Sequence, residues 1–192
     1  MENLGEMPHA YLLLAHGFEE IEAIAPLDIL RRAGVTVSLL GVGGEEITSA
    51  RGLRVRVDTQ LIRMPDQLPD MLILPGGEPG TSNLEESDMV KNLILKQHHA
   101  QRWIAAICAA PRILNALGIL HNRDATSFPA TEGQMTDCRY SHDPIVVCDH
   151  IITSRGAGTA LPFAYALVSI LYSHDLSTQL QKSMVYGQSK AS

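Results

Sequence analysis

The 192-residue sequence predicts an α/β fold with a doubly wound, mostly parallel sheet and helices on both of its faces. Short runs rich in Val, Ile and Leu alternate with longer amphipathic segments, a pattern typical of strands buried on both faces and of the helices that cover them. No repeat, low-complexity tract or long Pro/Gly/Ser-rich linker divides the chain. Residues 1–192 are therefore predicted to form a single domain.

The first half of the chain supplies three strands of the predicted sheet. HAYLLLA, residues 9–15, is an unbroken apolar run typical of a buried strand. Residues 19–34 predict a helix that ends at Gly34, with two arginines in the last turn, where the helix dipole favours cations. The elements expected next are a strand at 35–42, an edge ribbon at 47–61 and a third buried strand at 70–77.

The second half of the chain continues the alternation of helices and strands. Ser87 is placed to cap a helix over residues 87–102, and Gly118 closes a short helix over residues 110–118. The other expected elements are a fourth strand at 103–107, a hairpin at 144–156 that joins the sheet, and a last long helix at 158–172.

Composition narrows the classes of partner and the compartment. The formal net charge is −6 and no basic cluster is present, so neither nucleic acid nor an anionic membrane is a predicted partner. Cys108, Cys138 and Cys148 make neither an even disulfide framework nor a C-x-x-C pair, which favours a reducing compartment. Residues 1–9 lack the pattern of a signal peptide, and no run of 18 uncharged apolar residues follows. We expect a cytoplasmic protein.

The topology predicts where a functional site lies. Open doubly wound sheets bind ligands outside the carboxyl ends of their strands. The segments expected at that edge are Glu19, Glu20 and Glu22 after the first strand, Pro75–Gly77 after the third, Cys108 after the fourth, and Ser154–Gly156 after the hairpin.

Cys108 is the candidate nucleophile. It lies at a strand-to-helix turn, and the small residues Ala109 and Ala110 permit a sharp turn of the kind found at a nucleophile elbow. The unpaired N–H groups and the positive dipole end of the following helix favour a thiolate. The alternative is a packing cysteine, because free cysteines are among the most buried residues.

Glu22 is the candidate partner of this thiol. Its neighbours are apolar, and Pro26 lacks the N–H that would otherwise bond the carbonyl of Glu22, which predicts an irregular backbone. Burial and the like charge of a thiolate would keep the carboxyl group protonated, so that it donates a hydrogen bond to Cys108. The alternative is a solvated carboxylate at a helix start, the interpretation that suits Glu19 and Glu20.

The remaining candidate groups give weaker indications of a functional site than Cys108 and Glu22. Gly76 and Gly77 could offer backbone N–H groups to an oxyanion near Cys108, but no G-x-G-x-x-G motif or P-loop lysine indicates a nucleotide site. A zinc site could draw on four residues whose spacing fits no standard zinc pattern: Cys138, His142, Cys148 and His150. His98 and His99 are expected on a solvated helix face.

Nearly the whole chain resembles the ThiJ/PfpI superfamily, in the branch of the parkinsonism-associated protein deglycase and the YajL-type bacterial proteins. The resemblance rests on GFEEIEAIAPLDILRRAG, SARG, LPGG, AAICAAP, FP and TSRGAGTA in this order. It implies a flavodoxin-like fold and a homodimer, with no cofactor and no metal. The residues that it assigns are a reactive Cys108, its partner Glu22, the oxyanion donors Gly76, Gly77 and Ala109, and arginines near the site and the dimer contact, Arg32 and Arg51.

Three positions depart from relatives. Phe128 stands where the parkinsonism protein has a histidine, as in YajL-type members, so the resemblance implies a Cys–Glu site without an imidazole base. Ser49 replaces a peripheral cysteine of some relatives. Ala109 stands where protease-type members carry a histidine, which disfavours a cysteine peptidase.

The resemblance leaves two classes of function. One is an enzyme of glyoxalase or deglycase type that acts on methylglyoxal or on glycated amines and thiols through Cys108 and Glu22. The other is an oxidative-stress protein in which oxidation of Cys108 controls partner binding or chaperoning. A role in thiazole-phosphate biosynthesis draws on no phosphate site beyond Arg32 and Arg51.

Overall fold

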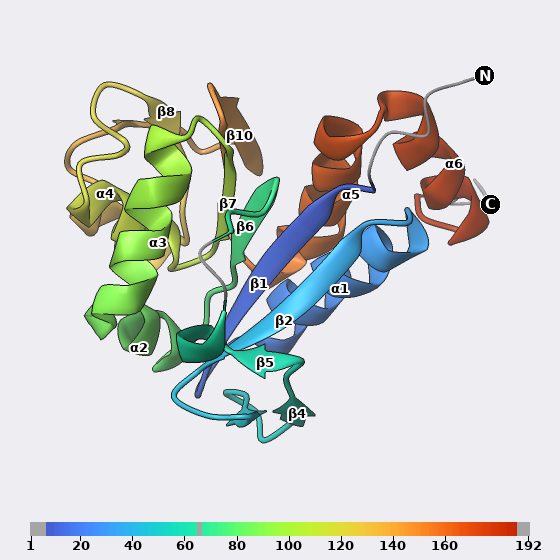
Figure 1. Cartoon of the computed structure of the whole chain (residues 1–192). Helices are drawn as coiled ribbons and strands as arrows, with labels where there is room; N and C mark the ends of the chain where they lie inside the picture. The colour runs from blue at the N-terminus through green and yellow to red at the C-terminus, as the bar shows by residue number, and fades with distance from the viewer. Residues whose placement is uncertain (1–6, 65–66, 188–192) are drawn as a thin grey trace.

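The computed structural model describes residues 7–64 and 67–187 and forms three layers, a central sheet between two layers of helices (Figure 1). Residues 1–6, on which part of the signal-peptide expectation rests, lie outside the described residues. The sheet has seven strands in the order β10-β11-β7-β6-β1-β2-β5. Their bounds are β1 His9–Ala15, β2 Thr36–Val42, β5 Thr59–Gln60, β6 Met71–Leu74, β7 Trp103–Ile107, β10 Ile145–Cys148 and β11 Ile151–Ser154.

The strand directions match the predicted fold class. Every neighbouring pair in the large sheet is parallel except β10 and β11, which form the expected antiparallel hairpin at one edge. The expected edge ribbon is more divided than predicted. The ribbon contains two short strands, β3 (Glu46–Thr48) and β4 (Arg54–Arg56), which pair with each other. Of its strands, only β5 joins the large sheet. A further small pair is β8 (Asp124–Ala125) with β9 (Arg139–Tyr140).

The helices divide between the two faces of the sheet (Figure 1). Helices α1 (Glu20–Arg32) and α5 (Ala160–Leu171) pack side by side on one face, and α6 (His174–Ser183) packs against α5. The other face carries α2 (Gly80–Glu86), α3 (Asp88–His99) and α4 (Pro111–Ala116). None of the helices among the described residues has the length and apolar character to cross a bilayer.

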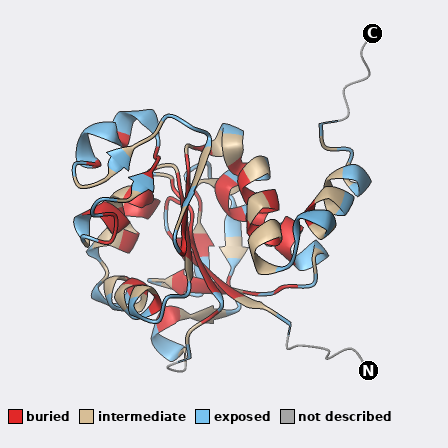
Figure 2. Cartoon of the chain, turned by 90° about the horizontal axis from the view of Figure 1, so that it is seen from above, coloured by how far each residue is buried: buried red, intermediate tan, exposed pale blue. Residues whose placement is uncertain are grey.

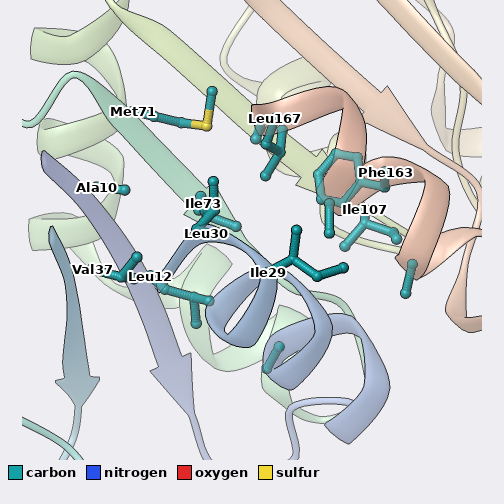
Figure 3. Packing of buried hydrophobic residues seen from close by; sticks show 14 of the residues in the cluster. Ala10, Leu12, Ile29, Leu30, Val37, Met71, Ile73, Ile107, Phe163 and Leu167 are labelled. Carbon is teal, nitrogen blue, oxygen red and sulfur yellow. The ribbon is translucent and has the colours of Figure 1, made fainter. Parts of the chain in front are cut away.

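Side chains of the central strands alternate between two cores. In β1, Leu12 and Leu14 face α1 and α5, whereas Tyr11 and Leu13 face the helices on the opposite side. This period of two follows from the pleat of a strand, and because both faces are covered the whole strand is apolar. Figure 2 shows the sheet as the buried centre of the molecule, and Figure 3 shows Leu12 and Ile73 packed with Ile29 and Phe163.

Two helices were not predicted from the sequence. Helix α2 follows the glycine- and proline-rich stretch GGEPG, whose composition indicates a turn. Helix α6 is mostly polar, but the hydroxyl of its N-cap Ser173 accepts a bond from Leu176 N–H at 3.2 Å, and Leu176 and Leu180 pack on the core. The predicted cap of α3 is confirmed, because Ser87 Oγ accepts from Val90 N–H at 3.4 Å.

The expectation that His98 is solvated is wrong. His98 at the end of α3 stacks on His150, which lies between β10 and β11, with 2.8 Å between Nδ1 and Nε2. His99 is exposed, as expected. Burial lowers the pKa of both His98 and His150, Arg123 lowers both further, and Asp149 opposes these effects. A single proton fits between the two ring nitrogens, so protonation of both rings breaks the contact.

This contact predicts a loss of stability in mild acid. Because the pKa of each ring is lowered on folding, the unfolded chain binds more protons below about pH 6.5, and the free energy of unfolding falls there. His98→Gln removes one titrating ring and keeps hydrogen-bonding capacity. We expect its midpoint of urea unfolding to fall less than that of the wild type between about pH 7.5 and pH 5. Equal falls in both proteins, with exposed His99→Gln as the control, would contradict the prediction.

Candidate active site

The four segments predicted at the carboxyl edge of the sheet come together in the structure. The N–H of Glu19, after β1, donates to Gly76 O, after β6, at 2.9 Å. The N–H of Cys108, after β7, donates to Ser154 O at the end of β11, also at 2.9 Å. These bonds cross-link the strand ends, so side chains from distant parts of the sequence share one site.

Cys108 occupies a strained turn between β7 and α4. Its φ of +65° lies in the left-handed region, which costs a residue with a side chain roughly 1 kcal/mol. Two backbone bonds hold the conformation: Cys108 N–H reaches Ser154 O, and Cys108 O accepts from Phe128 N–H at 2.7 Å. The result has the form of a nucleophile elbow, with a half-buried thiol at the strand end.

Glu22 lies beside this thiol on the first turn of α1. Its side chain is 1% exposed, and it lies close to Cys108, because a Cβ built on Gly76 would be 2.6 Å from both Cys108 Cβ and Glu22 Oε2. Gly76 N–H donates to Oε2 at 2.9 Å, while Oε1 is buried without a hydrogen-bond partner among the described residues. Helix α1 continues through Pro26, so the carboxyl group reaches the site from regular helical backbone.

Two glycines follow β6, and the short distance between Cys108 and Glu22 depends on them. A Cβ on Gly76 would lie 2.6 Å from both Cys108 Cβ and Glu22 Oε2, so a side chain there would separate the thiol from the carboxyl group. Gly77 has a φ of +91°, and a Cβ on it would lie 2.4 Å from Glu19 N. Glycine is therefore the residue that fits at both positions.

Burial controls the protonation of both groups. The pKa of Glu22 rises from 4.5 to about 7, because burial and the charge of Glu19 raise it by more than the nearby Cys108 thiol and the Gly76 N–H lower it. The pKa of Cys108 rises to about 12, mainly through burial and in addition through the neighbouring Glu22 carboxyl group. The N–H groups of Ala109 and Gly77 act in the opposite direction, because they favour the thiolate.

The expected effect of the helix end on the thiol is therefore outweighed. Helix α4 has only six residues, and burial together with the Glu22 carboxylate favours the thiol. Above about pH 7 the pair Cys108–Glu22 holds one proton, and a thiolate forms when that proton passes to Glu22. Cys108 and Glu22 therefore act as a unit, because the two groups cannot be charged at the same time.

The thiol opens into a pocket of about 340 Å³. The residues that line it are Gly77, Glu78, Cys108, Ala109, Arg112, Phe128, Ala130 and Thr131. Phe128 thus lies on the wall of this pocket. Arg112 and Glu78 were missed by the sequence analysis, although a lone arginine directly after the small residues AAP was an available signal.

The two arginines assigned by resemblance do not line this pocket within one chain. Arg32 lies at the end of α1 and pairs with Asp28 at 2.8 Å, with both side chains about half exposed. Arg51 is exposed, and its backbone N–H donates to Glu20 at 2.8 Å. Ser49 also donates to Glu20 through its hydroxyl, which makes Glu20 an anchor for this loop and not a solvated carboxylate.

The candidate zinc ligands do not form a cluster. Cys138 donates its S–H to Met135 O at 3.5 Å, and His150 faces His98. Within residues 7–64 and 67–187, no three His, Cys, Asp or Glu side chains are arranged to share an ion.

Most of the chain is similar to proteins of known family and structure. The DJ-1/PfpI family matches residues 8–170. "Protein dj-1beta" of Drosophila melanogaster is 36% identical over 92% of this chain and 96% of the relative. "Glutathione-independent glyoxalase DJR-1.2" of Caenorhabditis elegans is 35% identical over 90% and 93%. A solved structure described as "Toxoplasma gondii DJ-1, oxidized" superposes with a TM-score of 0.89 at 28% identity, covering 94% of this chain and 99% of the other.

The raised pKa of Glu22 predicts a stability effect opposite in sign to that of the histidines. Between pH 4.5 and 7 the unfolded chain loses the Glu22 proton and the folded chain keeps it, so stability falls as pH rises. Glu22→Gln removes this cost, which at about pH 8 amounts to roughly 3 kcal/mol. We expect chemical unfolding to show the variant more stable than the wild type at pH 8 and similar near pH 4. An advantage independent of pH, or one shared by exposed Glu86→Gln, would contradict the burial of an ionising carboxyl group.

Proposed function

The chain belongs to the DJ-1/PfpI family, and from that premise we propose that it is a cysteine-dependent enzyme that acts on reactive carbonyls such as methylglyoxal or its adducts. The observation that carries the proposal is the buried Cys108–Glu22 pair at the wall of a pocket of about 340 Å³. The name of the nematode relative supports the substrate class.

The first step is addition of the thiol to the aldehyde. The Cys108 proton passes through Glu22 to the carbonyl oxygen as sulfur bonds to the aldehyde carbon, which gives a hemithioacetal. The N–H groups of Gly77 and Ala109 favour negative charge on the sulfur, and we assign them as the donors to the developing oxyanion. Because the proton reaches the carbonyl oxygen, Cys108 does not have to keep the negative charge that burial disfavours.

The second step moves a proton between the two carbons of the substrate. The Glu22 carboxylate takes the proton from the former aldehyde carbon and an enediolate forms. Glu22 then returns this proton to the adjacent carbon, while the hydroxyl proton moves from the first oxygen to the oxygen of the adjacent carbon. The product is a thioester of lactate on Cys108, and water hydrolyses it to release lactate and the thiol. A pKa of about 7 suits Glu22 to both acid and base roles near neutral pH.

No imidazole is needed for this sequence of steps. Phe128 occupies the wall of the pocket, and none of the residues that line it is a histidine. Glu22 is the titratable group that contacts the thiol, so a single carboxyl group serves both proton transfers. A peptidase would require a base that activates the thiol for amide attack, and Ala109 follows Cys108 in place of a histidine.

Redox sensing is the second candidate, and the geometry of Cys108 favours it as well. A half-buried thiol beside a carboxyl group that can be protonated is placed so that the O–H of Glu22 donates to a sulfinate oxygen after oxidation. The similar structure from Toxoplasma gondii is described as oxidized. Turnover separates the two functions, because a sensor is modified once per chain.

We also propose that the protein is a homodimer through the outer face of α1. Ile21 is 53% exposed and Ile24 is 37% exposed, and they border a shallow apolar hollow with Ala25. Exposed apolar side chains grouped in this way indicate a contact surface. Ile21 lies next to Glu22, so a partner on this face would also stabilise the helix that carries the catalytic carboxyl group.

Catalysis predicts many lactates per chain from methylglyoxal. We expect Cys108→Ser to abolish lactate formation, because oxygen is a poor nucleophile at this site, and Glu22→Gln to lower kcat by at least about 100-fold through loss of the proton transfers. Cys138→Ser is the matched control and should retain full activity. Lactate formation that survives in Cys108→Ser would refute the mechanism, and one modification per chain without turnover would favour the sensor.

The dimer proposal predicts a change of mass. Light scattering after size exclusion should give twice the chain mass for the wild type and the single chain mass for Ile21→Lys, since a charge on this face prevents its burial. Ile62→Lys changes an isoleucine that is 70% exposed on another surface and should leave the dimer intact. A monomeric wild type would overturn the proposal.

A further inference from the structure

A charged wall stands beside Cys108 and is not explained by the proposed steps. Arg112 lies on the first turn of α4, and its side chain is only 12% exposed. All three guanidinium nitrogens are bound: Nη1 to Glu78 Oε1 at 2.5 Å, Nε to Glu85 Oε2 at 3.1 Å and Nη2 to Ser82 Oγ at 2.9 Å. Arg112 is therefore held in one position by residues of α2 and of the segment before it.

The wall is internally connected. Ser82 accepts from Arg112 and donates its hydroxyl hydrogen to Glu78 Oε2 at 2.8 Å. Glu78 and Arg112 both line the pocket of Cys108, and Glu85 contacts the guanidinium from α2. Turning Arg112 toward a ligand would break three hydrogen bonds, two of them to carboxylates.

The wall carries more negative than positive charge. Glu78 and Glu85 together place two carboxylates around one guanidinium, which leaves a net charge of about −1 at neutral pH. Their side chains are 48% and 36% exposed, so the wall acts on the pocket through a partly screened field. The pair Cys108–Glu22 adds a second negative charge once it has lost its first proton.

We propose that the wall formed by Glu78, Arg112 and Glu85 selects substrates by charge, favouring a carbonyl adduct on an amine or guanidine over a carbonyl compound that bears a carboxylate. The inference rests on the proposed function for its substrate class. A cationic group near the wall is attracted by the carboxylate that the guanidinium leaves unbalanced, whereas an anion is repelled by that carboxylate. The residues concerned are specificity determinants, and they take no part in the proton transfers.

The charge of the pocket is measured directly on the thiol. In a Cys138→Ser/Cys148→Ser background, Cys108 is treated with three methanethiosulfonates of similar size that carry an aminoethyl, a hydroxyethyl or a sulfonatoethyl group. Each rate constant is divided by that of the same reagent with N-acetylcysteine. We expect the normalised cation-to-anion ratio to exceed one at low salt, and to fall about threefold in Glu85→Gln, as one screened charge at a distance of several Å predicts.

Matched variants distinguish an electrostatic effect of the wall from a structural disturbance of the pocket. Asp175→Asn removes one carboxylate from exposed α6, far from the pocket, and should leave the ratio unchanged. Glu78→Gln should lower it as Glu85→Gln does, and added salt should lower it in the wild type. A wild-type ratio of one, or a ratio unchanged in both glutamine variants, overturns the inference.

This outcome is independent of turnover. A selective thiol without lactate formation would overturn the proposed enzyme and leave the charged wall established. Turnover of methylglyoxal by a protein whose thiol shows no charge selectivity would support the proposed enzyme and overturn the charged wall.

Discussion

Glu22 and Cys108 meet in a buried space that admits one negative charge between them, and the surrounding structure serves to keep them there. Burial raises the pKa of Glu22 to about 7 and that of Cys108 to about 12. Each group would be more stable in its neutral form if the other were ionised. Gly76 permits the approach, because a Cβ at this position would lie 2.6 Å from both side chains. The fold therefore supports a proton-sharing pair at the cost of a carboxyl group that disfavours burial when charged.

The sheet topology makes this pair possible without a continuous local motif. Glu22 follows the central strand β1, and Cys108 follows β7, with β6 between those strands. Parallel strands end at one edge, so the residues after β1, β6 and β7 converge although 86 positions separate Glu22 from Cys108 in the sequence. The left-handed φ of Cys108 is maintained by bonds to Ser154 and Phe128, both from later segments. The site is thus a consequence of the completed fold.

The sequence sufficed for the buried strands and the sheet edge, because continuous apolar runs are local signals. The pairing of Glu22 with Cys108 was left open by the residues alone and was assigned by the resemblance to a family. It did not suffice for α6, whose apolar contacts through Leu176 and Leu180 are few and whose remaining residues are polar. The contact of His98 with His150 joins residues 52 positions apart and leaves no local pattern. The contacts of Arg112 also leave no local pattern, because a partner such as Glu85 lies on α2. That helix was not predicted, since the stretch before it has the composition of a turn. The protonation state of the Cys108 thiol could not be predicted from the sequence either. It depends on the balance between the dipole of a short helix and the burial of the thiol, and only the structure shows that burial.

The buried pair and the charged wall have related consequences for chemistry. A carboxylate substrate would bring a third negative charge near Glu78 and the ionised pair, and this would disfavour thiolate formation as well as binding. A cation near the wall would act in the opposite sense, because it stabilises the state in which Cys108 has lost its proton. Substrate charge would then influence the nucleophile and not only the affinity. In this arrangement the fixed position of Arg112 matters as much as its charge, since a mobile guanidinium could turn to neutralise an anion and would remove the distinction.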